Sequence, residues 1–262
     1  MRRTTTGVTE GSRGRGGGSG RRGRPAPHWL WAAVVSLLLA VVAVMLWQFW
    51  SGPRLDVRRI ANLAAPGDLI VFFGDSITQG YGVRPEESFP ALVAQALGVP
   101  FANAGVAGDT MGAGLARMER DVLPHGPRLV VVEFGGNDFL RRVPVEETLR
   151  HLEAIVATLV RGGVMVAIAE INVGLGGDPY LAGYQAVADR HGALLIADVM
   201  RGILAGSDMR VDAIHPNAKG HRLIADRMTA ALRPLLAEAD RRRGVPATRS
   251  SAFRLPGVAP VG

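Results

Sequence analysis

Five short apolar runs, separated by helical patterns, constrain the fold of this chain more than any other feature of its sequence. The first run, 68–73, reads Asp-Leu-Ile-Val-Phe-Phe and stops at Gly74. Near-continuous apolar runs of this kind are typical of parallel strands that are covered on both faces of a sheet. The other expected strands span residues 99–104, 128–134, 164–171 and 193–199.

Helical patterns lie between the expected strands. Pro144 opens a pattern whose apolar residues recur at spacings of 3, 4 and 3, which indicates an amphipathic helix. These apolar residues are Leu149, Leu152, Val156 and Leu159. Further helices are expected at 89–97, 111–123 and 179–190, and in a last helix with a stripe of Ile224, Met228, Ala231 and Leu235. The alternation predicts an α/β fold with a five-stranded parallel sheet and helices on both faces.

The first 28 residues form a leader of different composition, with seven Arg, one Glu and eight Gly. The leader has almost nothing to bury, so we expect residues 1–28 to be disordered. It also contributes +6 of the formal net charge of +7, which leaves the remainder of the chain almost neutral. A basic nucleic-acid-binding domain is therefore not indicated, and the leader lacks the aromatic side chains that single-strand binding uses.

Residues 29–50 are 22 consecutive positions without a charge. At ~1.5 Å rise per residue, a helix of this length spans about 33 Å, close to the ~30 Å hydrocarbon core of a bilayer. Tryptophan lies near both ends, joined by Phe49 at the second, where aromatic belts occur in membrane proteins. The alternative is a cleaved signal peptide, whose apolar core is usually ~7–15 residues long and followed by small residues. Because this run is longer and ends in Leu-Trp-Gln-Phe-Trp, an uncleaved transmembrane anchor is favoured.

The arginines that flank the apolar run predict its orientation. Residues 13–28 contain five Arg and residues 51–66 contain three, which favours a cytoplasmic N-terminus and a periplasmic or otherwise extracytoplasmic globular part. Residues 51–66 are expected to be a linker, 67–240 the folded domain and 241–262 a flexible tail. The chain has no cysteine, which excludes disulfides, thiolate metal sites and cysteine nucleophiles.

Polar and glycine residues follow three of the expected strands, and a further polar group precedes the last helix. Ser76 lies just beyond the first strand, Gly105 beyond the second and Asn137 beyond the third. Asp212 and His215 stand shortly before the last helix. In a doubly wound sheet of order 2-1-3-4-5, the second and third strands flank the first, so Gly105 and Asn137 are expected on either side of Ser76. Ligands of such sheets bind beyond these carboxyl ends.

These residue types match the requirements of acyl transfer. The Ser76 hydroxyl is a weak nucleophile that needs an adjacent base, for which His215 is the candidate. Asp212, three residues before His215, can orient the imidazole and stabilise its protonated form. The oxyanion would take hydrogen bonds from the backbone amides of Ser76 and Gly105 and from the side-chain amide of Asn137.

The strings GDSITQGYG, NAGVAGDT, EFGGNDFL and DAIHPN, in this order, resemble the motifs of the SGNH (GDSL) hydrolase family. The four residues that name the family match Ser76, Gly105, Asn137 and His215, and the resemblance covers roughly residues 67–237. It is strongest to the bacterial thioesterase, lysophospholipase and arylesterase branch. The resemblance implies a flavodoxin-like three-layer α/β/α fold, a serine ester hydrolase that forms an acyl-enzyme intermediate, and neither metal nor cofactor. Loops at 140–146 and 172–179 look short, so substrate preference is not implied.

Each candidate has a plainer interpretation. Ser76 could be a helix N-cap, and Asn137 could satisfy a turn. His221 is a rival base, although its place in the last helix favours a surface position. Asp198 and Asp208 are rivals for Asp212, but neither lies within one helical turn of His215. The remaining histidines lack metal-ligand spacing, and the chain lacks the Gly-x-Ser-x-Gly of α/β-hydrolases.

The leading functional hypothesis is a membrane-anchored hydrolase of carboxylic esters or thioesters, acting on a small or lipid acyl ester. One alternative is an esterase that removes O-acetyl groups from a cell-envelope polysaccharide. Another is a non-catalytic binding module tethered to the envelope. The presence of Ser76, Asp212 and His215 together argues against the module, because a binding module has no use for all three.

Overall fold

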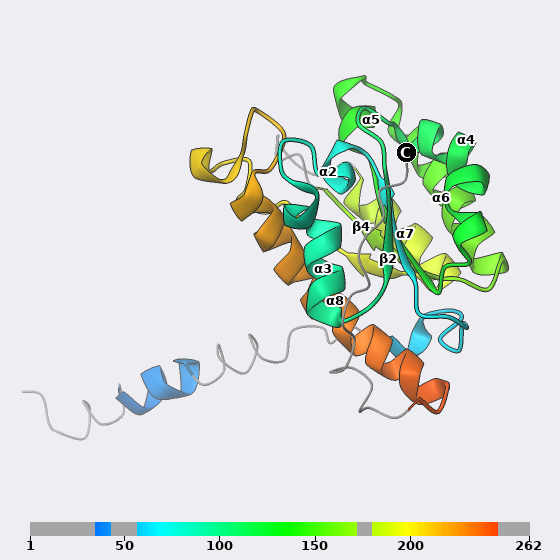
Figure 1. The fold of residues 1–262 in the computed structure, drawn as a ribbon. Coiled ribbons are helices and arrows are strands. Elements are labelled where there is room, and N and C mark those ends of the chain that lie inside the picture. The colour runs from blue at the N-terminus through cyan, green and yellow to red at the C-terminus, as the bar shows by residue number, and fades with distance from the viewer. Residues whose placement is uncertain (1–34, 43–56, 172–179, 246–262) are drawn as a thin grey trace, which may run out of the picture. The chain divides into compact units, whose positions relative to one another are not determined.

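The computed structural model describes residues 35–42, 57–171 and 180–245. The chain divides into two units, Met1–Arg54 and Leu55–Gly262, and the sheet belongs to the second. All five strands of this sheet are parallel, in the order β2-β1-β3-β4-β5 (Figure 1). The strands are β1 Ile70–Gly74, β2 Phe101–Gly105, β3 Leu129–Glu133, β4 Met165–Ala169 and β5 Leu194–Ile196. The prediction of a five-stranded parallel sheet is confirmed.

Helices connect the strands, and most begin or end within a few residues of the expected positions. The described α-helices are α2 Ser76–Gln79, α3 Phe89–Leu97, α4 Met111–Asp121, α5 Gly136–Leu140, α6 Val145–Arg161, α7 Leu181–His191 and α8 Ala218–Arg242. Short 3-10 helices lie at η1 Val57–Arg59, η2 Pro85–Glu87, η3 Leu123–His125 and η4 Ser207–Met209. The two shortest α-helices, α2 and α5, follow β1 and β3. A helix start near Ser76 was anticipated, whereas α5 was not expected from sequence.

Alternate residues of each strand belong to two separate hydrophobic cores, because successive side chains of a strand point to opposite faces of the sheet. Ile70 and Phe72 belong to the core that α3 and α8 cover. Val71 and Phe73 belong to the core that α4, α6 and α7 cover. The result is three layers, with helices on both faces of the sheet, as Figure 1 shows. Burial on both faces explains why every residue of β1, β3 and β4 is buried.

The strand register brings the site segments together at one edge of the sheet. Gly74, the last residue of β1, lies opposite Gly105 of β2 and Glu133 of β3. A methyl group on Gly105 would collide with the backbone of Gln79, and one on Gly74 would collide with Thr78 and Glu133. Glycine is therefore required at both positions so that α2 can lie directly against the ends of the strands.

The predicted anchor, 29–50, lies mostly outside the described residues, of which only 35–42 fall within it, as a helix. No helix in the described part of the chain is both long and apolar enough to cross a bilayer. The leader 1–28, residues 51–56 of the linker 51–66 and most of the tail 241–262 also lie outside the described residues. These boundaries, including those of the domain at 67–240, stay predictions.

Candidate active site

Ser76 is the first residue of α2, directly after the turn that ends β1. Asp75, not Ser76, caps this helix: its side chain accepts a hydrogen bond of 3.0 Å from the amide of Ile77. The plainer interpretation of Ser76 as the N-cap is therefore wrong. Its hydroxyl remains free for another partner, although the residue is largely buried.

That partner is His215. Its Nε2 lies 2.9 Å from Ser76 Oγ, and its Nδ1 lies 2.7 Å from Asp212 Oδ2. The second Asp212 oxygen accepts from the backbone amides of Ile214 and His215, at 2.9 and 2.8 Å. The ring of Tyr81 also packs against the imidazole, with 4.5 Å between ring centroids. The three residues predicted to act together are thus adjacent, although 139 positions separate Ser76 from His215.

The hydrogen bonds to Asp212 also set its charge state. The Ile214 amide and then the His215 side chain favour the carboxylate form, and they lower the pKa of Asp212 from 3.8 to about 2. The side chain is 44% exposed, so the ion is not stripped of water. Asp212 is therefore a carboxylate throughout the neutral range and can face a protonated imidazole.

The rival residues are engaged elsewhere. The interpretation of His221 as a surface residue is wrong, because it is fully buried and its Nδ1 accepts a hydrogen bond from the amide of Phe89. Burial lowers the pKa of His221 from 6.5 to about 4, so it stays neutral. Asp198 pairs with Arg201, and Asp208 lies 3.4 Å from Lys219.

The groups predicted to hold the oxyanion lie near Ser76, but protein atoms already accept hydrogen bonds from two of them. Asn137 Nδ2 donates to Asp75 Oδ2 and to the carbonyl of Asp109, both at 3.0 Å. The Gly105 amide donates to Asn103 Oδ1 at 2.9 Å. Asn137 lines the cavity beside Ser76, whereas Gly105 lies behind α2 at the end of β2. A substrate oxyanion would have to compete with these internal acceptors.

Two buried carboxyl groups lie beneath the Ser76 segment. Asp75 is 2% exposed, and burial is the main cause that raises its pKa from 3.8 to about 6. Glu133, at the end of β3, is 1% exposed and accepts hydrogen bonds from the amide and hydroxyl of Thr78. Burial, followed by repulsion from Asp75, raises the pKa of Glu133 well above its usual value. Through these hydrogen bonds Glu133 links the end of β3 to α2.

A cavity of about 260 Å³ opens beside Ser76 and His215. Apart from the site residues Asp75, Ser76, Asn137 and His215, it is lined by Ile77, Gly136, Phe139, Leu140, Ile171, Met200, Leu204, Ala213 and Ile214. None of these nine lining side chains carries a polar group. In the described part of the chain, no group of three or more His, Asp or Glu side chains could hold a metal ion.

Sequence reasoning missed the neighbours of Ser76 and His215. One signal for Glu133 was available: a carboxyl residue at the end of the apolar run Leu-Val-Val-Val-Glu-Phe is costly to bury without a role. Tyr81 and Arg117 carry no such local signal. Arg117 is buried beside the end of β1, and its partners come from three different segments of the chain.

This fold and site define a class of protein, the serine hydrolases that act on ester bonds. Within that class, the chain belongs to the GDSL-like Lipase/Acylhydrolase family, whose model matches residues 72–223. The resemblance to the SGNH (GDSL) hydrolases is thereby confirmed.

Individual relatives agree with this assignment. The chain is 30% identical over 195 residues to thioesterase 1/protease 1/lysophospholipase L1 of Escherichia coli K12, covering 71% of this chain and 94% of the relative. It is 28% identical over 168 residues to an arylesterase of Vibrio mimicus, covering 60% and 84%. Among solved structures, the psychrotrophic esterase EstA from Pseudoalteromonas sp., inhibited by monoethylphosphonate, matches with a TM-score of 0.60 and 27% identity, over 65% of this chain and all of that one.

Proposed function

We propose that this protein is a membrane-anchored serine hydrolase that cleaves carboxylic esters or thioesters through Ser76, His215 and Asp212. The observation that carries the proposal is the pair of hydrogen bonds from Ser76 Oγ through the His215 ring to Asp212, at 2.9 and 2.7 Å. These distances lie within the range over which a base can take a proton from a nucleophile. Inhibition of the related EstA by a phosphonate supports a serine nucleophile.

In the proposed mechanism, Ser76 Oγ attacks the acyl carbonyl while His215 Nε2 takes the hydroxyl proton. The carbonyl oxygen becomes an oxyanion that accepts hydrogen bonds from the Ser76 amide and from Asn137 and Gly105, once these release their internal acceptors. His215 then gives its proton to the leaving alcohol or thiol, which departs and leaves an acyl-serine. Water, deprotonated by the same imidazole, attacks the acyl-serine. The bond between the acyl carbon and Oγ then breaks, His215 returns the proton to Ser76 Oγ, and the carboxylic acid leaves.

The cavity favours an apolar acyl group over an acetylated sugar. Among the described residues, the side chains that line it offer sugar hydroxyls no hydrogen-bond partner beyond the site residues themselves. Its volume of about 260 Å³ is just below the ~300–1,000 Å³ common for sites that hold whole small molecules. We therefore expect the cavity to hold one arm of the substrate, a short or medium acyl chain, while the leaving group stays outside.

A panel of p-nitrophenyl esters from acetyl to palmitoyl, with an acyl-CoA and a lysophospholipid alongside, tests this function. Full-length protein should hydrolyse these esters, with kcat/KM highest at short or medium chains and lower at palmitoyl. Ser76→Ala, which leaves the cavity intact, is the matched control and should be inactive throughout. Activity confined to acetyl groups, with release of acetate from an O-acetylated polysaccharide, would favour the alternative esterase. No hydrolysis of any ester would favour the binding module.

The membrane anchor and the location of the domain are part of the same proposal. The uncharged run 29–50 and the five-to-three arginine asymmetry support an anchor with a cytoplasmic N-terminus and an extracytoplasmic domain. Alkaline phosphatase fused after residue 60 should be active, since this reporter requires export. An inactive fusion would reverse the orientation. A mature protein that begins near residues 44–51 would replace the anchor with a cleaved signal peptide.

A further inference from the structure

Arg117 is a buried cation on α4 that the proposed chemistry does not use. Its side chain is 9% exposed, and its guanidinium lies 4.7 Å from the ring centroid of Phe73. Burying an arginine is costly unless each of its donors finds an acceptor. The acceptors of Arg117 therefore indicate which segments this residue holds together.

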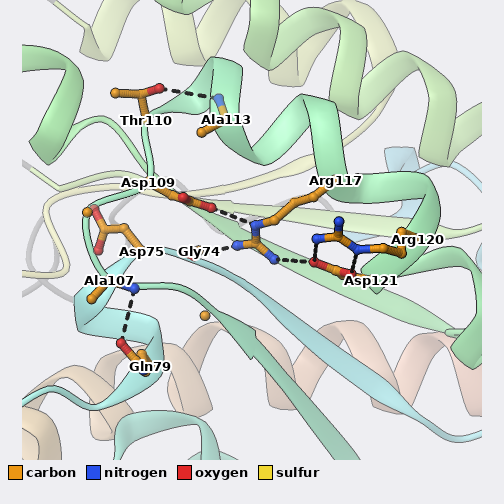
Figure 2. Close-up of polar contacts among 12 residues, drawn as sticks. Gly74, Asp75, Gln79, Ala107, Asp109, Thr110, Ala113, Arg117, Arg120 and Asp121 are labelled. Atoms are coloured by element: carbon orange, nitrogen blue, oxygen red, sulfur yellow. Dashed lines mark hydrogen bonds and ion pairs between the residues drawn. The ribbon is translucent and has the colours of Figure 1, made fainter.

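Three acceptors surround the guanidinium (Figure 2). Nε donates to Asp109 Oδ2 at 2.6 Å, one terminal nitrogen donates to the carbonyl of Gly74 at 3.0 Å, and the other lies 3.3 Å from Asp121. Asp121 is on the same helix as Arg117, so this hydrogen bond does not link α4 to another segment. Gly74, in contrast, is the last residue of β1, and Asp109 lies in the loop between β2 and α4.

The end of β1 and the loop at Asp109 each lie next to a group of the proposed site. Gly74 is two residues before Ser76, and its carbonyl also accepts from the Val106 amide, next to Gly105. Asp109 presents its backbone carbonyl to Asn137 Nδ2 at 3.0 Å. A single guanidinium thus fixes the distance between the end of β1 and the carbonyl that orients the Asn137 amide.

We propose that Arg117 is a positioning residue that orients the Asn137 amide toward the oxyanion by holding Asp109 against the end of β1. Asn137 Nδ2 has only two hydrogens, and the Asp109 carbonyl holds one of them. The other, which donates to Asp75, is therefore the hydrogen that the substrate oxyanion can share. Without Arg117, the link between Asp109 and the end of β1 is lost, and the Asn137 amide is no longer held in one orientation. This inference rests on the proposed function, because it assigns Asn137 to the oxyanion.

Arg117→Gln in the full-length protein tests the proposal against a matched variant. Arg128 is also a buried arginine that pairs with an aspartate, Asp240, at 2.6 Å, but it lies at the opposite end of β3 from the site. Arg128→Gln should therefore lower thermal stability with kcat nearly unchanged. Arg117→Gln should lower kcat for p-nitrophenyl butyrate by up to ~10²-fold while KM changes little, since misplacement by about 1 Å has that effect.

A double-mutant cycle with Asn137→Ala tests the route of the effect. If Arg117 acts through Asn137, adding Arg117→Gln to Asn137→Ala should cost little more. Equal losses in both backgrounds, or a loss of stability without a loss of kcat, would overturn the proposal. Arg117→Lys should recover part of kcat, because an ammonium keeps the charge beside Asp109 but not the forked geometry.

A spectroscopic readout keeps the result separate from the proposed function. In ¹⁵N-labelled protein, the side-chain amide protons of Asn137, assigned by their absence in Asn137→Ala, should exchange faster in Arg117→Gln and not in Arg128→Gln. Asp109→Asn should give the same faster exchange and serves if Arg117→Gln does not fold. Unchanged exchange in both Arg117→Gln and Asp109→Asn would contradict the positioning role of Arg117, even if the enzyme is active. Faster exchange in a protein without esterase activity would contradict the proposed function but would still support the role of Arg117 in holding the Asn137 amide.

Discussion

Two aspartates flank the Ser76–His215 pair, and their surroundings move their pKa values in opposite directions. Asp212 is 44% exposed, accepts two backbone amides and has a pKa lowered to about 2. Asp75 is 2% exposed, and burial raises its pKa to about 6. Both start from an ordinary value of 3.8, and the main causes of the difference are burial for Asp75 and hydrogen bonds for Asp212.

This contrast indicates how the site divides its work. A carboxylate that must stabilise a transient imidazolium should stay charged at every working pH, and Asp212 does. A carboxyl group that holds a turn and an amide needs acceptor oxygens but no charge, and Asp75 is shielded accordingly. Pairs of acids whose environments push their pKa values apart commonly mark the different roles of a catalytic site. The exposed side of the site thus provides a carboxylate at every working pH, whereas the buried side provides acceptor oxygens whose charge depends on pH.

The largest expected effect tests whether Ser76, which lies between the exposed and the buried side of the site, is the nucleophile. Ser76→Ala should lower kcat by ~10⁶-fold, and adding His215→Ala should cost little more, because the residues act as a unit. The measurement is kcat for p-nitrophenyl butyrate in the purified single and double variants. Substantial turnover by Ser76→Ala would place the nucleophile elsewhere, and the comparison of the two aspartates would lose its meaning.

Asp212→Asn tests the charged side. The amide keeps the shape of the carboxylate but loses the charge that favours the correct imidazole tautomer, so kcat should fall by up to ~10⁴-fold. Asp208→Asn is the matched control, since Asp208 lies in the same region, is exposed and contacts Lys219 rather than His215. If the two variants lost activity equally, the charge of Asp212 would have no special role.

Asn137→Ala tests the oxyanion assignment. Loss of one donor typically costs ~10²–10³ in kcat, with little change in KM. The fluorophosphonate reactivity of Ser76 should persist, at a lower rate. Gly105→Ala is a poorer test, because its methyl group would collide with the Gln79 backbone and move α2. An effect of Asn137→Ala confined to KM would mean that this amide binds the substrate in its ground state.

The sequence predicted the sheet and the main site residues because both depend on local patterns. Apolar runs covered on both faces are readable from a single chain, and the strand order then brings Ser76, Gly105 and Asn137 to one edge. Distant contacts that no motif marks were not readable: the raised pKa of Asp75, the hydrogen bonds of Arg117 and the burial of His221 depend on segments elsewhere in the chain, in the case of His221 on Phe89, 132 residues away.

The smallest expected effect tests the buried side through stability. Because the folded-state pKa of Asp75 is raised from 3.8 to about 6, the folded protein keeps a proton over this interval that the unfolded chain releases. The stability that this group contributes is present below pH ~4 and is lost as the pH rises through ~6, by at most about 3 kcal/mol.

Asp75→Asn removes this titration and also the repulsion by which Asp75 raises the pKa of Glu133, and both changes act in the same direction. Relative to the natural protein, the free energy of unfolding of the variant should therefore rise by up to about 3 kcal/mol between pH ~4 and ~7, measured by urea unfolding. His221, with its pKa lowered to about 4, loses stability in the opposite direction as the pH falls, but it is present in both proteins and cancels in the difference. A flat difference for Asp75→Asn over this interval would mean that Asp75 is ionised in the folded protein as readily as Asp212, and the contrast between the two sides of the site would not exist.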